Sequence, residues 1–301
     1  MAPGYRHRAT RGIPMGTERI TSLACWRGPV TLDPISGGIT NRNYVVRDGD
    51  RRYVVRICAP LPHLGINRRN EVACQIAAHA IGVAPAVVHH EDGILVSDFI
   101  DARTLSAEDL HDTDRLARLA ELLRTLHGKW DRLVGEMLYF SPFQTVQTYA
   151  VTARQRDAKL PDNLSSLLDD ARQLAHRMKP FTPVLCHNDL LAANILDDGR
   201  RLVLVDWEYG GIGNPLFDLA GISGNCGLSD DLERELLAAY RSRVVDEDLA
   251  DLRILKTVSL LREALWAVIQ TVASDIEFDY ARYAEDNLHA YREARQRLDA
   301  S

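Results

Sequence analysis

The side chains best suited to chemistry lie between residues 187 and 208. His187, Asp189 and Asn194 follow one another as His-x-Asp-x₄-Asn, and Asp206 follows the next two apolar runs. The Asp-Gly pair at 198–199 separates those runs, which is a strong hairpin signal and predicts that Asn194 and Asp206 lie at the same end of a two-stranded ribbon. An amide oxygen and a carboxylate placed together suit Mg²⁺, which takes oxygen ligands.

The other two residues of this stretch fit the same chemistry. Asp189 lies on the same loop as Asn194, so it can face the metal without binding it and accept a proton from an attacking hydroxyl. We count His187 with Asp189 and Asn194 as catalytic residues, and expect His187 to act by holding the loop in shape. Any one of these residues alone is more often a turn cap or a structural histidine. Together they supply the base, the metal ligands and the loop that phosphoryl transfer requires.

Three segments resemble one enzyme family. The residues above resemble the catalytic and metal-binding motifs of the aminoglycoside phosphotransferase and choline kinase superfamily, relatives of the protein kinases. Residues 36–44 resemble the phosphate loop of the choline/ethanolamine kinase branch, and 265–270 and 275–284 resemble the helices that carry its choline pocket. The similarity covers about residues 20–295. It implies ATP- and Mg²⁺-dependent transfer of the γ-phosphoryl group to the hydroxyl of choline, ethanolamine or a similar amino alcohol.

The resemblance also implies a nucleotide site. Gly37, Gly38 and Asn41 lie on a turn where backbone N–H groups can approach phosphate oxygens, although a Gly-Gly turn alone is also typical of a plain hairpin. Arg56 stands where protein kinases carry their phosphate-binding lysine, and Glu71 is its expected ion-pair partner. The alternative for this pair is a surface arginine and glutamate.

Two further segments take their roles from the same resemblance. Asp98 to Ile100 resembles the hinge whose backbone groups hydrogen-bond adenine, so both residues are assigned to cofactor binding. Asp218 resembles the aspartate that braces the catalytic loop, and we predict a structural role for it.

Aromatic and acidic residues suggest how the acceptor is bound. A quaternary ammonium is recognised by aromatic faces, helped by a carboxylate. Glu208 and Trp266 are the strongest candidates, followed by Glu263 and Phe278. The other possible walls are Trp207, Tyr209, Tyr280 and Tyr283, and about half of such aromatics at helical spacing belong to a core.

One position departs from the family pattern. Eukaryotic choline kinases carry two tryptophans three residues apart on this helix, and the first of them corresponds to Glu263 here. A carboxylate favours any cationic amine, and it can accept hydrogen bonds from a primary ammonium, which choline lacks. Ethanolamine therefore stays an alternative to choline.

The elements that position these residues form two lobes. Alternating apolar residues between 30 and 57 predict a β-meander, and 70–82 has helical spacing followed by a second hairpin at 87–99. Later segments predict mostly helices, with strands near 195–196 and 202–205. We predict an α+β, protein-kinase-like two-lobe fold with a small antiparallel β-rich N-lobe carrying one helix and a larger, mostly helical C-lobe. Leucines at 116, 119, 123 and 126 recur at helical spacing, and the other expected helices are 164–178, 231–243, 248–273 and 277–298. The expected divisions are a tail at 1–17, a nucleotide-binding lobe at 18–100 and a catalytic, acceptor-binding lobe at 101–301.

Composition excludes several other classes. The chain has 301 residues, 46% hydrophobic, with a net charge of −6, which disfavours nucleic-acid binding and suits a cationic substrate. Five scattered cysteines without a CxxC pair signal neither disulfides nor zinc. The sequence shows neither a membrane-spanning run nor a secretory signal, so we expect a cytoplasmic protein without membrane insertion, whose true start could be Met15. It fixes no oligomeric state.

Two other functions are alternatives to an amino-alcohol kinase. An aminoglycoside-type or other small-alcohol kinase of the same superfamily would favour an acidic acceptor pocket without the aromatic pattern of residues 266–283. A non-catalytic nucleotide-binding protein on a kinase fold would be expected to lose Asp189, Asn194 or Asp206. None of the three is lost.

Overall fold

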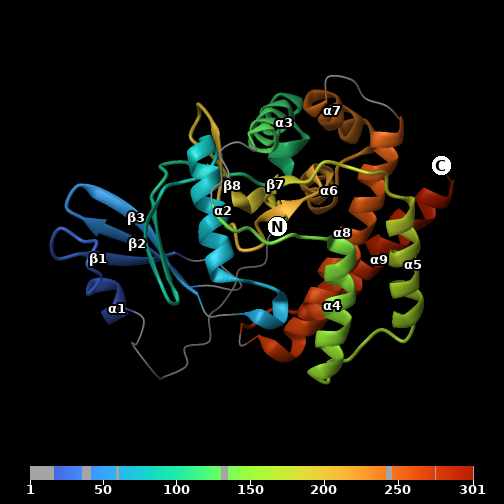
Figure 1. The fold of residues 1–301 in the computed structure, drawn as a ribbon, viewed down its shortest axis with the longest axis horizontal. Coiled ribbons are helices and arrows are strands. Elements are labelled where there is room, and N and C mark those ends of the chain that lie inside the picture. The colour runs from blue at the N-terminus through green and yellow to red at the C-terminus, as the bar shows by residue number, and fades with distance from the viewer. Residues whose placement is uncertain are drawn as a thin grey trace.

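A computed structural model of the chain describes residues 17–35, 42–58, 61–129, 135–241, 246–274 and 276–300. Its smaller lobe is a five-stranded antiparallel sheet with strand order β1-β2-β3-β5-β4 (Figure 1). The strands are β1 (Thr31–Ile35), β2 (Arg42–Asp48), β3 (Arg51–Ile57), β4 (Val87–Glu91) and β5 (Ile94–Asp98), preceded by the short helix α1 (Thr17–Thr21).

The smaller lobe also contains one long helix, α2 (Arg68–Ile81). It begins two residues earlier than the apolar spacing indicated, because the side chain of Asn67 caps it by accepting from the backbone N–H groups of Arg69 and Asn70. It ends at Gly82, whose φ of 95° is a conformation that glycine adopts without steric cost. The earlier start places Glu71 within the first turn of the helix, on a buried face.

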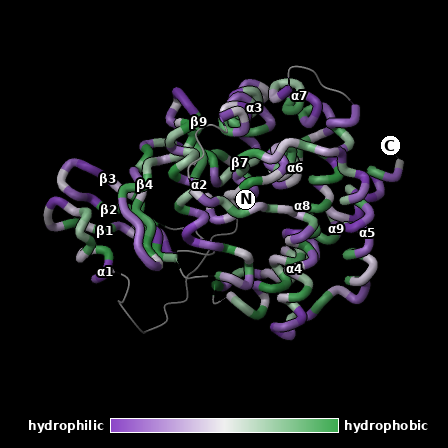
Figure 2. Tube along the Cα trace, in the orientation of Figure 1, coloured by the Kyte–Doolittle hydropathy of each residue, from purple (hydrophilic) through white to green (hydrophobic). Residues whose placement is uncertain are grey.

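The sheet alternates as the sequence predicted. Val46, Val55 and Val96 are buried on one face and pack with Ile20 of α1, whereas the loop joining β2 and β3 is hydrophilic (Figure 2). Arg56 on β3 lies opposite Leu95 on β5. Because β3 is the central strand, Arg56 lies in the middle of the sheet.

The larger lobe is mostly helical. It includes two helices that the spacing did not predict, α4 and α6, and four predicted helices whose ends differ: α5 stops at Arg177, α7 stops at Tyr240, α8 starts at Asp246 and α9 starts at Tyr280. Residues 242–245 lie outside the described part of the chain. The helices are α3 (Thr113–Gly128), α4 (Pro142–Gln155), α5 (Leu164–Arg177), α6 (Pro215–Asn225), α7 (Asp230–Tyr240), α8 (Asp246–Ala273) and α9 (Tyr280–Ala300). Single 3₁₀ turns occur at η1 (Pro62–Leu64), η2 (Glu108–His111) and η4 (Ala192–Asn194).

Two small sheets carry the loops of the larger lobe. The strands β6 (Arg103–Thr104), β8 (Ile195–Asp197) and β9 (Leu202–Leu204) form one, and β7 (Val184–Cys186) pairs with β10 (Gly211–Gly213) in the other. The hairpin predicted around the Asp-Gly turn is present as β8–β9, with Ile195 opposite Leu204. The N–H of Val205 donates to the carbonyl of Asn194 at 3.0 Å, so the chain positions bearing Asn194 and Asp206 are adjacent.

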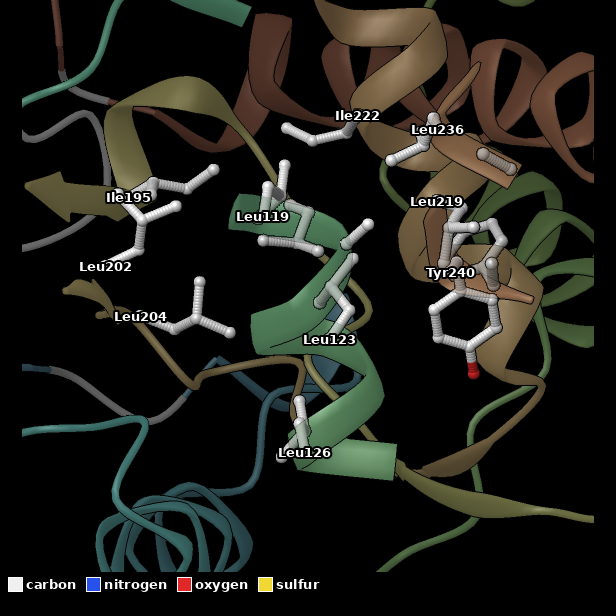
Figure 3. Packing of buried hydrophobic residues seen from close by; sticks show 14 of the residues in the cluster. Leu119, Leu123, Leu126, Ile195, Leu202, Leu204, Leu219, Ile222, Leu236 and Tyr240 are labelled. Atoms are coloured by element: carbon white, nitrogen blue, oxygen red, sulfur yellow. The ribbon is translucent and has the colours of Figure 1, made fainter. Parts of the chain in front are cut away.

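Helix α3 packs between these strands and the helices. Its Leu119, Leu123 and Leu126 point into a cluster formed with residues of β8, β9, α6 and α7 (Figure 3). The neighbours drawn there are Ile195, Leu202, Leu204, Leu219, Ile222, Leu236 and Tyr240. Burial of this apolar surface holds the β8–β9 hairpin against α3, and α6 packs against the same helix.

The predicted α+β class with a β-rich lobe and a helical lobe is confirmed, whereas the exact lobe boundaries stay a prediction. Among the described residues, none of the helices combines the length and apolar character needed to cross a lipid bilayer.

Candidate active site

A buried aspartate holds the catalytic loop. Asp218 on α6 accepts hydrogen bonds from the backbone N–H groups of His187 at 2.8 Å and Asn188 at 2.7 Å. Asn188 has a φ of 63°, a left-handed conformation that few non-glycine residues adopt. The structural role predicted for Asp218 agrees with these contacts, because the two bonds hold the loop just before Asp189.

His187 ties the same loop to the hairpin. Its ring is fully buried, with Nε2 2.9 Å from the carbonyl oxygen of Val205 and the ring centroid 4.8 Å from that of Trp207. These contacts suit the predicted role of His187 in holding the loop. Trp207 is also fully buried and donates its indole N–H to Leu204, so its prediction as a possible acceptor wall is wrong.

A possible metal cluster behind the loop has a simpler explanation. Ligand atoms of His127, Cys186 and Asp218 lie within 4.8 Å of one another. His127 already contacts Asp218 and the hydroxyl of Tyr240, and burial raises the pKa of the Cys186 thiol well above its usual value. A neutral thiol is a poor metal ligand, so this group is a hydrogen-bonded part of the core.

Asn194 and Asp206 offer the oxygen atoms that Mg²⁺ prefers. The side-chain N–H₂ of Asn194 donates to the backbone carbonyl of Asp189 at 2.9 Å, which leaves its amide oxygen for a cation. Asp206 has a φ of 68° and a partly exposed carboxylate. A buried amide and an accessible carboxylate at one end of a hairpin fit magnesium, and non-glycine residues held at positive φ are frequent at functional sites.

Arg56 lies between two carboxylates. Its Nη1 is 2.6 Å from Oε1 of Glu71 and 2.7 Å from Oδ1 of Asp206, so the predicted Arg56–Glu71 ion pair is confirmed. Burial opposes the charge of Arg56, but the attraction of Asp206 and Glu71 outweighs it and raises the pKa of the guanidinium. The cluster joins β3, α2 and the segment after β9.

The sequence did not point to Arg68, which extends this cluster. Its Nη1 donates to Oε2 of Glu71 at 2.7 Å and lies 3.1 Å from Oε2 of Glu208. Burial and the neighbouring Asp206 raise the pKa of Glu208 to about 7. Glu208, predicted to bind the acceptor, thus contacts the nucleotide-lobe helix; it also lines a cavity of about 510 Å³ with Tyr209 and residues of α4.

Arg262 on α8 contacts the proposed base. Its Nη2 donates to Oδ1 of Asp189 at 2.8 Å, and its Nη1 donates to the backbone carbonyl of Asn188 at 3.3 Å. Nη1 is also 3.3 Å from Oε1 of Glu263. Sequence reasoning missed Arg262, although an arginine within a largely apolar stretch of a helix must find buried partners and was a usable signal.

Three of the four main acceptor candidates, Trp266, Glu263 and Phe278, come together at the junction of α8 and α9. Trp266 packs edge-on to Tyr280 and Tyr283, with ring centroids 5.9 and 6.3 Å apart, and Phe278 packs against the same two tyrosines at 4.9 and 5.8 Å. The hydroxyl of Tyr283 donates to Oε2 of Glu263 at 3.3 Å. Four aromatic rings and one carboxylate therefore form a single cluster.

The remaining predicted residues belong to the nucleotide side. Asp98 ends β5 opposite Tyr53, and Ile100 follows it in the segment that leaves the sheet, so adenine contact there stays a prediction. Gly37, Gly38 and Asn41 lie outside the described residues, between the end of β1 and the start of β2.

Comparison with known proteins agrees with this geometry. Residues 31–267 match the model of the family described as "Phosphotransferase enzyme family". The chain belongs to this family. The implied relationship to phosphotransferases and to choline and ethanolamine kinases is confirmed.

The relatives of this phosphotransferase carry consistent names. It is 27% identical over 295 residues to a probable ethanolamine kinase of Arabidopsis thaliana, covering 84% of this chain and 76% of that protein. It is 26% identical over 266 residues to protein LicA of Haemophilus influenzae, covering 84% and 77%. A crystal structure of a choline/ethanolamine kinase family protein from Mesorhizobium loti superposes with a TM-score of 0.76 at 28% identity, covering 92% of each chain.

Proposed function

We propose that this phosphotransferase transfers the γ-phosphoryl group of ATP to the hydroxyl of a small amino alcohol, choline or ethanolamine. The observation that carries the proposal is the position of Asp189. On one side Asn194 and the Arg56 cluster offer metal and phosphate contacts, and on the other side Arg262 connects Asp189 to Glu263 and the aromatic cluster. A carboxylate between a phosphate site and an ammonium site is what such a reaction needs.

Asp189 would orient the acceptor hydroxyl and take its proton. The hydrogen bond from Arg262 engages Oδ1, so Oδ2 can face the substrate. Asp218 and Asn194 hold the loop on both sides, the first through backbone N–H groups and the second through the Asp189 carbonyl. A loop held this firmly presents the base in one orientation, which is the main protein contribution to phosphoryl transfer.

Arg56 would bind the nucleotide phosphates. Its planar, permanently charged guanidinium suits phosphate oxygens, and Glu71 holds it in place. Asn194 and Asp206 would hold Mg²⁺, which when bound neutralises charge on the phosphate oxygens. A structure of LicA in complex with AMP, which superposes with a TM-score of 0.73, supports an adenine nucleotide as the donor.

The ammonium of the acceptor would lie against the aromatic cluster and Glu263. Aromatic faces attract a quaternary ammonium, while the carboxylate attracts any cationic amine and can accept hydrogen bonds from a primary one. The structure offers both features side by side, and the relatives include proteins named as choline kinases and as ethanolamine kinases. Both alcohols are therefore proposed substrates.

Five free cysteines and a nucleotide substrate support a cytoplasmic location, where thiols stay reduced.

Turnover with a panel of alcohols tests the proposal. The purified protein is supplied with ATP and Mg²⁺ and, in turn, choline, ethanolamine, 3,3-dimethyl-1-butanol and kanamycin, and the phosphorylated product is identified by mass spectrometry. We expect product from choline or ethanolamine, with Asp189→Asn as the inactive control. Phosphorylation of kanamycin alone would overturn the proposal in favour of an aminoglycoside enzyme.

A pair of matched variants tests which carboxylate binds the ammonium. Glu263→Gln should raise the acceptor KM about tenfold through loss of one nearby charge. Glu208→Gln should act mainly on the nucleotide side, because Glu208 contacts Arg68. If instead Glu208→Gln raised the acceptor KM and Glu263→Gln acted mainly on the nucleotide side, the acceptor site would be assigned to the cavity beside Tyr209.

A further inference from the structure

Arg262 has an environment that packing alone does not explain. Its side chain is 3% exposed, and its guanidinium carbon lies 4.7 Å from the ring centroid of Tyr209 and 5.8 Å from that of Phe140. Its Nε, fully buried, has no hydrogen-bond partner among the described residues. Burying a charge and leaving a donor unpaired both cost stability, and an apolar side chain would avoid both costs.

What Arg262 gains is contact with two acidic side chains and the catalytic loop. Asp189 contacts Nη2 of the guanidinium at 2.8 Å, Glu263 contacts Nη1 at 3.3 Å, and the carbonyl of Asn188 accepts from Nη1 as well. Asn188 is the residue with left-handed backbone that directly precedes Asp189. Arg262 thus contacts both the carboxylate and the backbone that orients it.

The charges of these three side chains sum to −1. One guanidinium contacts two carboxylates, so with all three side chains charged a single ammonium brings the group to neutrality. Without Arg262 the formal charge would be −2, and because burial and Asp189 already raise the pKa of Glu263, an ammonium would be the partner that keeps both carboxylates ionised. In an amino alcohol an ethylene group separates nitrogen from oxygen, so the ammonium could then also reach Asp189 and compete there with the hydroxyl that must be activated.

We infer that Arg262 is a positioning residue that keeps Asp189 directed at the acceptor hydroxyl by preventing it from pairing with the acceptor ammonium. This inference rests on the proposed amino-alcohol acceptor. Arg262 lowers the affinity of the enzyme for a cationic acceptor and raises turnover. Its removal should therefore change binding and turnover in opposite directions, which loss of folding does not do.

The test compares Arg262→Met with Arg262→Lys and wild type. Turnover is measured with choline and ethanolamine, and the acceptor Kd by calorimetry in the presence of a non-hydrolysable ATP analogue. We expect Arg262→Met to lower kcat about 100-fold, the effect of misplacing a catalytic group. Its choline Kd should fall about tenfold, because a second carboxylate becomes available. Arg262→Lys should restore much of both values.

Two controls separate charge from folding. 3,3-Dimethyl-1-butanol has the shape of choline without its charge, so its Kd should not tighten in Arg262→Met. Arg253→Met removes another partly buried, ion-paired arginine of α8, whose Nε contacts Glu233 far from the site. It should lower the melting temperature while kcat and the choline Kd stay near wild type.

The outcomes distinguish this inference from the proposed function. If wild type phosphorylates neither amino alcohol, the proposed function fails, and the charge argument fails with it. If wild type phosphorylates choline or ethanolamine but Arg262→Met weakens acceptor binding, or leaves kcat unchanged, the proposed function stands and the inference is overturned.

Discussion

The two ends of the site are built alike but supported differently. At the end proposed to bind phosphate (the phosphate end) Arg56 contacts Glu71 and Asp206, and at the end proposed to bind the acceptor (the acceptor end) Arg262 contacts Asp189 and Glu263. The first cluster joins β3 and α2 of the smaller lobe to a loop of the larger one, whereas the second lies wholly within the larger lobe. The phosphate end therefore depends on how the lobes meet, and the acceptor end does not.

The largest effect should come from the base at the acceptor end. Asp189→Asn keeps the hydrogen bond to Arg262 but loses the ability to take a proton, so kcat should fall about 10³-fold. Because Asp189 does not contact Arg56, the affinity for ADP, measured by titration, should stay within about twofold. A variant with near-wild-type kcat would show that Asp189 is not the base.

The next largest effect should come from the residue that links the lobes. Asp206→Asn removes both the predicted metal ligand and the charge that faces Arg56, so kcat should fall about 100-fold and more Mg²⁺ should be needed for half-maximal rate. Removing Mg²⁺ from wild type with a chelator should stop turnover, and adding it back should restore it. An unchanged magnesium requirement in the variant would remove Asp206 from the metal site.

A smaller effect should distinguish charge from shape at the phosphate end. Arg56→Met should lower kcat/KM for ATP about 30-fold, whereas Arg56→Lys should stay within about tenfold of wild type because an ammonium can still contact phosphate. The acceptor Kd should be the same in both variants if the two ends are supported independently. A parallel loss of acceptor affinity would contradict that independence.

The smallest effect should lie in the aromatic cluster. Trp266→Leu keeps an apolar side chain but removes an aromatic face, so the KM for choline should rise about fivefold while that for ethanolamine changes less. Steady-state kinetics with both alcohols measures the ratio. Equal effects on the two would indicate that Trp266 acts by packing alone.

Local patterns predicted the parts of the site that lie close together in sequence. The Asp-Gly turn predicted the β8–β9 hairpin, and the hairpin explains why Asn194 and Asp206 share one end. The Arg56–Glu71 ion pair was predicted from the family resemblance and not from local spacing, because β3 and α2 come into contact only in the tertiary structure. Trp207 was wrongly predicted as an acceptor wall, since its position after a strand does not reveal whether its ring faces the core or the cleft.

The spacing of apolar residues revealed neither helix α6 nor the contact made by Arg262. Helix α6 is buried on nearly all sides from Pro215 to Ser223, so its apolar residues show no helical stripe. Arg262 was missed because its partner Asp189 lies 73 residues away in the chain. Apolar spacing identifies a buried helix, but it does not identify which distant carboxylate an arginine within that helix will meet.

The burial of α8 has a consequence for how ligand binding can be detected. From Thr257 to Gln270 each of its residues is buried, and the helix packs against α4, α6 and α9. Backbone amides in such a helix exchange with deuterium mainly through global unfolding. An acceptor held by Glu263 and Trp266 should therefore slow exchange on α8 only as far as it raises the global stability, and its local footprint should be sought at the first turns of α9.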